Sequence, residues 1–190
     1  MTAPAETPPI TARVEEKFPG AVTASHQQFG DETITVAKDQ YLAVMTLLRN
    51  DPTLKFNLMV DLSAVDFLGQ SPRFQVVVHL KSLSLGHRLR VKVGVGEDGP
   101  EACTLPTISK LWVAADWYER ECFDMYGIRF QGHPNLKRLL LYESFVGHPL
   151  RKDYDIHLQQ PRVELRPVRE RYDYQNRNLT DPSETERRPL

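Results

Sequence analysis

The sequence predicts an α+β fold: a mixed or antiparallel sheet of about four strands, helices packed on one face, and an extended C-terminal arm. Two neighbouring segments, 74–80 and 89–95, alternate apolar and polar residues with the period of a β-strand. The segments 40–50 and 108–126 instead repeat apolar residues every three or four positions, as amphipathic helices do. From Arg151 onward charged residues replace both patterns, and such a stretch cannot bury enough apolar surface to form its own core.

The first part of the chain contains shorter expected elements. Residues 1–10 combine proline with few large apolar side chains, so we expect them to be disordered. A short helix is expected at 11–18, and a strand of β-branched residues at 33–36. Asp39 is predicted to be the N-cap of the helix over 40–50, because its carboxylate can accept a backbone N–H in the first turn.

The expected sheet continues with a mostly apolar central strand at 56–65. The short link 84–87 then joins the two alternating segments into an antiparallel hairpin. The polar positions of the second segment form a cationic stripe of Arg88, Arg90 and Lys92, for which a solvated face is the simpler interpretation and a docking surface the alternative. We expect one domain over 11–150, and a charged arm over 151–190 that orders on a partner surface.

Composition excludes several functional classes. The 190 residues carry 24 Lys+Arg and 25 Asp+Glu, a formal net charge of −1, which argues against bulk nucleic-acid binding and a polybasic membrane anchor. No apolar run approaches the length of a membrane span, and the N-terminus lacks the pattern of a secretory signal. Cys103 and Cys122 are too few for a disulfide framework or an iron–sulfur cluster, so we expect reduced thiols.

Two kinds of motif could carry chemistry, and each has a simpler explanation. The glycines of Gly94–Gly99 have the spacing of a dinucleotide-binding loop, but the preceding strand belongs to a hairpin and prolines interrupt the residues after it. The triplets Gly132-His133-Pro134 and Gly147-His148-Pro149 could place two imidazoles near carboxylates for a metal. Because a residue before proline is extended, we interpret each triplet first as a rigid turn with an exposed imidazole.

The second predicted helix is the most informative segment. Glu119 falls within its apolar sector, so the carboxylate must be paired or hydrogen-bonded. Trp117 lies on the opposite side, beside Arg120 and Asp124, and an exposed tryptophan among charges is typical of the centre of a protein–protein contact. Ion pairs at the four-residue spacing of Asp116, Arg120 and Asp124 would explain the charges but not the tryptophan, so we favour an interface.

These residues belong to a longer pattern. Glu119-Arg120-Glu121, then Asp124-Met125-Tyr126-Gly127-Ile128, then the stretch from Phe130 to Leu141 closely resemble the signature of one family. That family is the C subunit of the respiratory NADH:quinone oxidoreductase (complex I). The stretch Gly147–Tyr154 is similar to its second hallmark, and the resemblance covers about Phe56 to Asp155. One departure is Cys122, where the resemblance leads us to expect a larger side chain.

The resemblance implies an α+β subunit of the hydrophilic arm that holds no flavin, no iron–sulfur cluster, no metal and no catalytic residue of its own. It implies docking on the quinone-site subunit and neighbouring iron–sulfur subunits, at the cytoplasmic face of the bacterial inner membrane. Electron transfer from NADH to quinone then belongs to the whole complex. The residues expected in the signature and interface are Trp117, Glu119, Arg120, Glu121, Asp124, His133, Pro134, Arg138, His148, Pro149, Arg151, Lys152 and Asp153.

Two alternatives stay open. The first is a small metal-dependent hydrolase that uses His133, His148 and a carboxylate. The second is the equivalent subunit of a related membrane-bound hydrogenase, because that class of complex is expected to share the fold.

Overall fold

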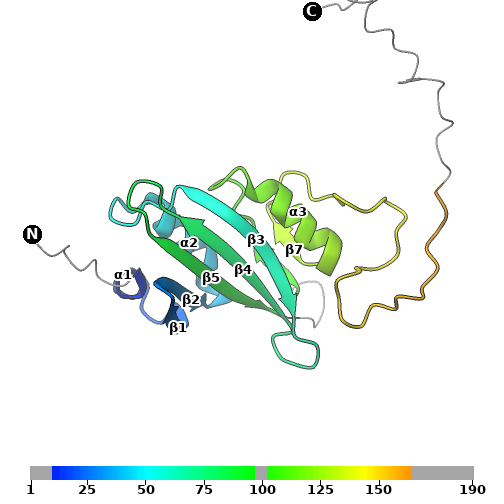
Figure 1. The fold of residues 1–190 in the computed structure, drawn as a ribbon, viewed down its shortest axis with the longest axis horizontal. Coiled ribbons are helices and arrows are strands. Elements are labelled where there is room, and N and C mark those ends of the chain that lie inside the picture. The colour runs from blue at the N-terminus through cyan, green and yellow to red at the C-terminus, as the bar shows by residue number, and fades with distance from the viewer. Residues whose placement is uncertain (1–9, 97–101, 164–190) are drawn as a thin grey trace, which may run out of the picture. The chain divides into compact units, whose positions relative to one another are not determined.

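The computed structural model describes residues 10–96 and 102–163. The helices are α1 (Ile10–Lys17), α2 (Tyr41–Asn50) and α3 (Ala115–Tyr126), and a 3₁₀ helix, η1 (Lys38–Gln40), leads into α2. The strands are β1 (Val22–Gln28), β2 (Asp31–Val36), β3 (Leu58–Asp66), β4 (Phe74–Lys81), β5 (Arg88–Val95), β6 (Thr104–Pro106) and β7 (Arg129–Gln131). The larger sheet has five strands in the order β1-β2-β5-β4-β3, and β6 pairs with β7 in a second sheet (Figure 1).

A parallel pair lies at the centre of the larger sheet. β2 pairs with β5 in parallel, whereas the other three pairings are antiparallel. β4 and β5 form the predicted hairpin, in which Phe74 lies opposite Val95 and Lys81 lies opposite Arg88. The sheet is mixed, as predicted, because the chain between β2 and β5 crosses over through α2 before it builds β3 and β4.

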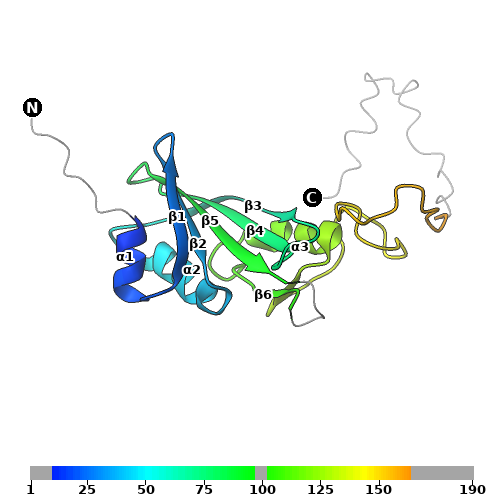
Figure 2. The ribbon, with the colours of Figure 1, turned by 90° about the horizontal axis from the view of Figure 1, so that it is seen from below.

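One face of this sheet is buried. Every second side chain of β4, from Phe74 to Leu80, is at most 1 % exposed, and β5 continues the alternation. α2 covers this inner face and lies behind the strands in Figure 1, while Figure 2 shows α1 and α2 on one side of the sheet. The buried residues of α2 are Tyr41, Val44, Met45 and Leu48. Burial of such apolar side chains stabilises the domain by about 25 cal/mol per Å².

The structure has one strand more in this sheet than the expected four, and it shifts one helix boundary. β1 carries no apolar alternation that would predict it, because nearly all its side chains are exposed. β6 has no counterpart among the expected elements, and it pairs in parallel with β7. The helix expected over 108–126 begins only at Ala115, because residues 108–114 form turns.

The predicted cap of α2 is wrong. Asp39 lies within η1, and Gln40 occupies the cap position without a side-chain bond to the first turn. The 3₁₀ turn is closed by the Gln40 N–H, which donates to the Ala37 carbonyl at 3.1 Å. This tighter turn leads the backbone directly into the helix, so the Asp39 side chain is not in the cap position.

The described residues up to Gln160 belong to one compact unit. Residues 151–160 therefore belong to the unit that contains the sheet. The expected disorder over 1–10 and the docking arm fall largely on residues 1–9 and 164–190, which lie outside the described residues, and both stay predictions. Within the described ranges, no helix has the length and apolar character that crossing a membrane requires.

Candidate functional site

The predicted signature residues gather around α3. This helix packs along β3, where the Tyr118 hydroxyl donates to the Val60 carbonyl at 3.2 Å. It ends at Gly127, whose φ of 78° is left-handed and whose N–H donates to the Phe123 carbonyl. A second constraint selects glycine there, because a Cβ would lie only 2.7 Å from His148 Nε2. The chain can therefore return close to the end of the helix.

Glu119 is fully buried and holds the preceding turns against α3. Its carboxylate accepts the Thr107 hydroxyl at 2.5 Å and the Ile108 backbone N–H at 2.7 Å, so the predicted hydrogen-bonded carboxylate is confirmed. Burial raises the pKa of Glu119 from 4.5 to about 7, although these two bonds oppose the rise, and the charge of Asp116 adds to it. Glu119 thus connects two parts of the chain that are not adjacent in sequence.

The His133 side chain is also buried, so the prediction of an exposed imidazole at this position is wrong. The Asn135 N–H donates to its Nδ1 at 3.0 Å, which leaves the proton on Nε2 to be donated to the Asp116 carbonyl at 3.1 Å. Nε2 also lies 3.9 Å from the Glu119 carboxylate. The turn after β7 folds back onto α3, and the ring bonds both pieces of backbone instead of facing solvent.

Asp124 organises the signature segment, which we define as residues 133–158 and which contains no helix or strand. Its buried carboxylate accepts the backbone N–H groups of residues 139–141 at 2.8 to 3.0 Å and Nη1 of Arg138 at 2.8 Å. Burial would raise the pKa of Asp124, but these bonds together hold it below its usual value. Arg138 continues the network by donating to the carbonyls of Phe145 and Gly147.

The second Gly-His-Pro triplet docks on the same helix end. Nδ1 of His148 bonds the Asp124 carbonyl at 2.9 Å, and Nε of Arg151 donates to the Tyr126 carbonyl at 2.5 Å. His148 is half-buried, so the predicted exposed imidazole is wrong here too. Burial lowers the pKa of His148, and although its bond to Asp124 opposes this, the nearby charges of Arg151 and Arg138 lower it further.

A second buried charge cluster holds the end of the predicted signature. Arg73 is 2 % exposed and donates two bonds to Asp66, at 2.8 Å each, and two to Asp153, at 3.1 and 2.6 Å. The Lys152 backbone N–H adds a bond to Asp66. Hydrogen bonds from Arg73 hold the pKa of both carboxyls below the usual value, although burial opposes this.

Arg73 is a functional residue that the sequence reasoning did not identify. The available signal was an arginine placed directly before the first apolar residue of a central strand, where a cation has to find a partner.

The outward side of α3 carries exposed apolar residues. Trp117 is 60 % exposed, and Val113, in the turn before the helix, is 86 % exposed. The Arg120 guanidinium lies 5.1 Å from the centre of the Trp117 ring and donates to the carbonyls of Lys137 and Arg138. Arg120 therefore joins the helix to the signature segment, and the tryptophan stays at the surface as predicted.

We define the interface surface by four residues: Val113, Trp117, Arg120 and Leu140, the last of which is 65 % exposed. The alternative of ion pairs at four-residue spacing does not describe this helix, because Arg120 bonds backbone carbonyls and Asp124 bonds Arg138. Three other predicted residues, Glu121, Pro134 and Lys152, are exposed, and Pro149 is half-buried.

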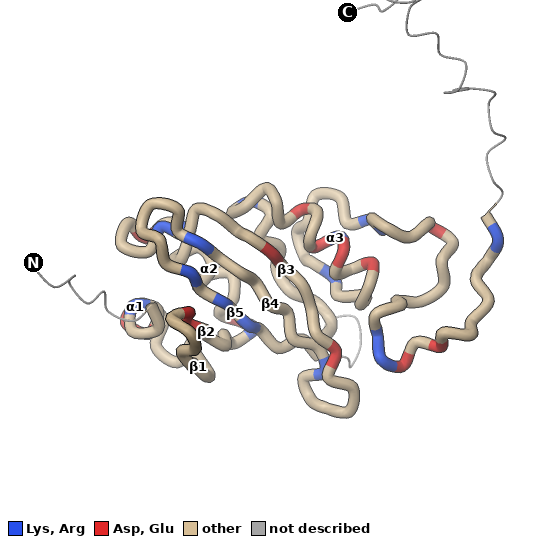
Figure 3. Tube along the Cα trace, viewed as in Figure 1, with Lys and Arg blue, Asp and Glu red and all other residues tan. Residues whose placement is uncertain are grey.

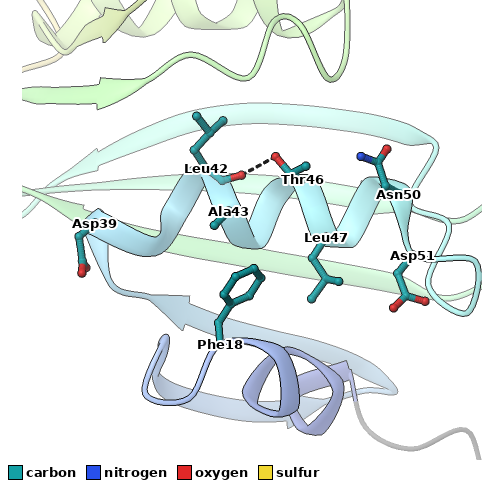
Figure 4. A pocket seen from close by; sticks show the side chains of 8 residues that line it. All are labelled: Phe18, Asp39, Leu42, Ala43, Thr46, Leu47, Asn50 and Asp51. Carbon is teal, nitrogen blue, oxygen red and sulfur yellow. Dashed lines mark hydrogen bonds between the residues drawn. The ribbon is translucent and has the colours of Figure 1, made fainter.

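An open groove lies elsewhere, between α1 and α2 (Figure 4). Apolar side chains such as Phe18 and Leu47 line it, and Asp51 at one end is paired with Arg13 at 3.0 Å. None of the predicted signature residues is among the 8 that line this groove. We therefore place the candidate site at α3 and the signature segment.

Known proteins that are similar to this chain identify its family. The family described as respiratory-chain NADH dehydrogenase, 30 Kd subunit, matches residues 34–160. The chain belongs to this family. Its similar sequences include the C subunit of the NADH-quinone oxidoreductase of Citrifermentans bemidjiense, which is 43 % identical over 80 % of this chain and 91 % of that protein. The corresponding protein of Azorhizobium caulinodans is 39 % identical over 92 % of this chain and 85 % of its own length.

Two solved structures share the fold of this family member. The trypsin-resistant fragment (1-134) of Nqo5 matches with a TM-score of 0.57 and 28 % identity, over 67 % of this chain and 96 % of the fragment. A chain of the membrane-bound sulfane sulfur reductase, an archaeal respiratory membrane complex, matches with a TM-score of 0.63 and 25 % identity. This match covers 78 % of the present chain and 85 % of the reductase chain. The resemblance seen in the sequence is thus confirmed, and the chain is a subunit of a complex I-type assembly.

Proposed function

We propose that this subunit is a non-catalytic scaffold of the peripheral arm of NADH:quinone oxidoreductase. It docks on the quinone-site subunit and neighbouring iron–sulfur subunits, at the cytoplasmic face of the bacterial inner membrane. Flavin and iron–sulfur clusters belong to the partners, and electron transfer from NADH to quinone belongs to the assembly. One observation carries the proposal: Glu119, Asp124 and Arg138 of the signature bond this chain's own backbone, while large apolar side chains beside them are exposed.

The bound state of the charged groups favours assembly over acid–base chemistry. Asp124 accepts four bonds, and His133 uses both ring nitrogens on protein partners. A general acid or base needs a lone pair or proton that can reach a substrate. Trp117 and Leu140, in contrast, expose the kind of large apolar surface that forms the centre of protein interfaces.

The two alternatives have less support. A hydrolase would need His133 and His148 to offer nitrogens to one metal ion, and Nδ1 of His133 already accepts a backbone N–H. A hydrogenase subunit would share the fold, but the family match and the similar sequences carry the name of the NADH-quinone enzyme.

Affinity purification of the tagged chain from its native membranes tests the proposal. We expect the quinone-site and iron–sulfur subunits in the eluate, with NADH oxidation that the isolated chain lacks. Trp117→Ala combined with Leu140→Ser should weaken recovery of the quinone-site subunit at least about tenfold, since truncated interface anchors cost more than about 1 kcal/mol each. The matched control is Leu83→Ala, which removes a side chain that is 62 % exposed in the β4–β5 turn.

Two results would contradict the proposal: a chain that purifies without partners, or one that carries its own flavin or cluster absorbance.

The docking arm is tested separately by deletion of residues 161–190. This truncation keeps Asp153 and its bonds to Arg73. Lower recovery of partners at unchanged stability supports the arm, and unchanged recovery argues against it.

A further inference from the structure

The outer face of the large sheet carries a cluster of cations. Along β4 and β5, the positions that alternate with the buried core residues point to this face. The cations at these positions are Lys81, Arg88, Arg90 and Lys92. Figure 3 shows Lys and Arg positions side by side along these two strands. We refer to these four residues as the basic face.

The pairing register places two cations directly opposite one another and a histidine opposite a third. Lys81 lies opposite Arg88, and His79 lies opposite Arg90. Like charges opposite one another in a sheet are destabilising, so this arrangement lowers the stability of the free domain. Burial lowers the pKa of His79 and the charge of Arg90 lowers it further, whereas the charges of Asp61 and Asp31 oppose the fall.

The chain itself neutralises little of this charge. Arg88 forms an ion pair with Asp31 at 2.9 Å. In the ranges 10–96 and 102–163, no carboxylate lies within ion-pair distance of Lys81, Arg90 or Lys92. These three side chains are also half-buried, so their carbon stems lie over the sheet and hold the charges close to the strands.

We propose that the basic face is a second docking surface, which binds an acidic surface of a neighbouring protein subunit in the same complex. Charge complementarity identifies the partner: carboxylates would supply the counter-ions that the chain lacks, and would relieve the repulsion between opposite cations. The inference rests on the proposed function, since it assumes an assembly, but it concerns a face distinct from the interface surface on α3.

A protein surface suits the basic face better than anionic lipid does. Leu58 and Val65 on the adjacent strand β3 are exposed, and β4 contributes Val77 between the cations. Arginine together with apolar groups is typical of protein interfaces. Lipid-binding segments use about four to eight unpaired Lys or Arg, whereas Arg88, one of the four cations here, is already paired with Asp31.

Lysine footprinting of the intact complex tests the proposal. Acetylation of Lys81 and Lys92 should be at least about fivefold slower in the complex than in the isolated folded chain, because an interface excludes solvent from its centre. Zero-length carbodiimide cross-linking should join one of these lysines to an Asp or Glu of another subunit. Equal acetylation in both samples, without any such cross-link, overturns the proposal.

Charge reversal supplies the second arm of the test. Arg90→Glu with Lys92→Glu should lower recovery of the cross-linked subunit at least about tenfold, since like charges across an interface are strongly unfavourable. Lys17→Glu with Lys55→Glu makes the same change in net charge at exposed positions away from this face, and should leave recovery unchanged.

Flotation of the purified chain with phosphatidylserine vesicles distinguishes the lipid alternative. Binding that the Arg90→Glu/Lys92→Glu variant loses would assign the face to a membrane and overturn the proposal. Failure of the proposal for the basic face differs from failure of the proposed function. In the second case the tagged wild-type chain would recover no other subunit at all.

Discussion

The five-stranded sheet and the signature segment are held together in different ways. The sheet buries apolar side chains such as Val78 and Val91, both fully excluded from solvent. The signature segment has no regular structure, and its course is set by bonds to Asp124 and Arg73. One apolar residue can replace another in a core at modest cost, whereas a buried charge that loses its partner is costly. The polar residues around α3 therefore set the course of an irregular surface segment rather than fill a core.

Replacement of Arg73 by Ala should give the largest loss of stability and should release the signature segment selectively. Asp66 would lose its counter-ion while it stays buried, which costs about 3–5 kcal/mol in the free energy of unfolding. Urea denaturation measures this loss. Limited proteolysis should show new cleavage near Asp153, because that residue loses its two bonds to the guanidinium.

A double variant separates lost charge pairing from lost volume at this position. Arg73→Met with Asp66→Leu removes both buried charges, and should regain more than about half of the stability lost in Arg73→Ala. Cleavage near Asp153 should persist in the double variant. Wild-type stability of Arg73→Ala alone would show that the cluster does not hold the segment.

Replacement of Leu80 by Ala probes the apolar core of the five-stranded sheet. Leu80 is 1 % exposed in the central strand β4, so its truncation leaves a cavity that costs about 3 kcal/mol. Loss of core packing should lower the denaturation midpoint of the whole unit without selective cleavage of the signature segment. Leu80→Met keeps most of the volume and should cost less than about 1.5 kcal/mol. Selective cleavage in Leu80→Ala would contradict the distinction between the two regions.

Glu119 gives the stability of the folded domain a pH dependence. Because its pKa in the folded chain is about 7 and its usual value is 4.5, the folded state holds a proton that the unfolded chain has released between these values. The free energy of unfolding should therefore fall as pH rises, by about 2 kcal/mol from about pH 5 to about pH 7. Glu119→Gln is neutral throughout and should remove that part of the slope. Identical slopes in urea titrations of both proteins would contradict this assignment.

Trp117 should have the smallest effect on folding. Its ring is exposed, and its contact with the Arg120 guanidinium is worth about 0.5–1 kcal/mol at such a site. Trp117→Ala should therefore change the unfolding free energy by less than about 1 kcal/mol while it weakens co-purification of the quinone-site subunit. A large loss of stability with unchanged partner recovery would mean that the tryptophan serves the fold instead of an interface.

Periodic burial explains how much of the fold could be predicted. The predicted bounds of the β4–β5 hairpin and of α2 agree with the structure within one or two residues, because buried side chains recur at the spacing of a strand or a helix. β1 lacks that signal, since its side chains are polar and exposed. Asp39 is not the cap because a 3₁₀ turn, invisible in the pattern, precedes the helix.

The site was only partly predictable for a related reason. The need of Glu119 for hydrogen bonds followed from its place in an apolar stripe, but the identity of its donors depended on how the preceding turns fold. The local sequence around His133 indicates an exposed turn, but the imidazole is buried because the turn packs on α3. Arg73 and Asp153 are 80 positions apart, and no local pattern encodes a contact at that separation.

The distance along the chain between Arg73 and Asp153 has a consequence for biosynthesis. A polypeptide that emerges from the ribosome N-terminus first contains every strand of the large sheet before residue 153 has been made. At that stage the guanidinium has one carboxylate partner instead of two. The order of translation therefore makes docking of this stretch onto Arg73 a late event in the folding of the chain.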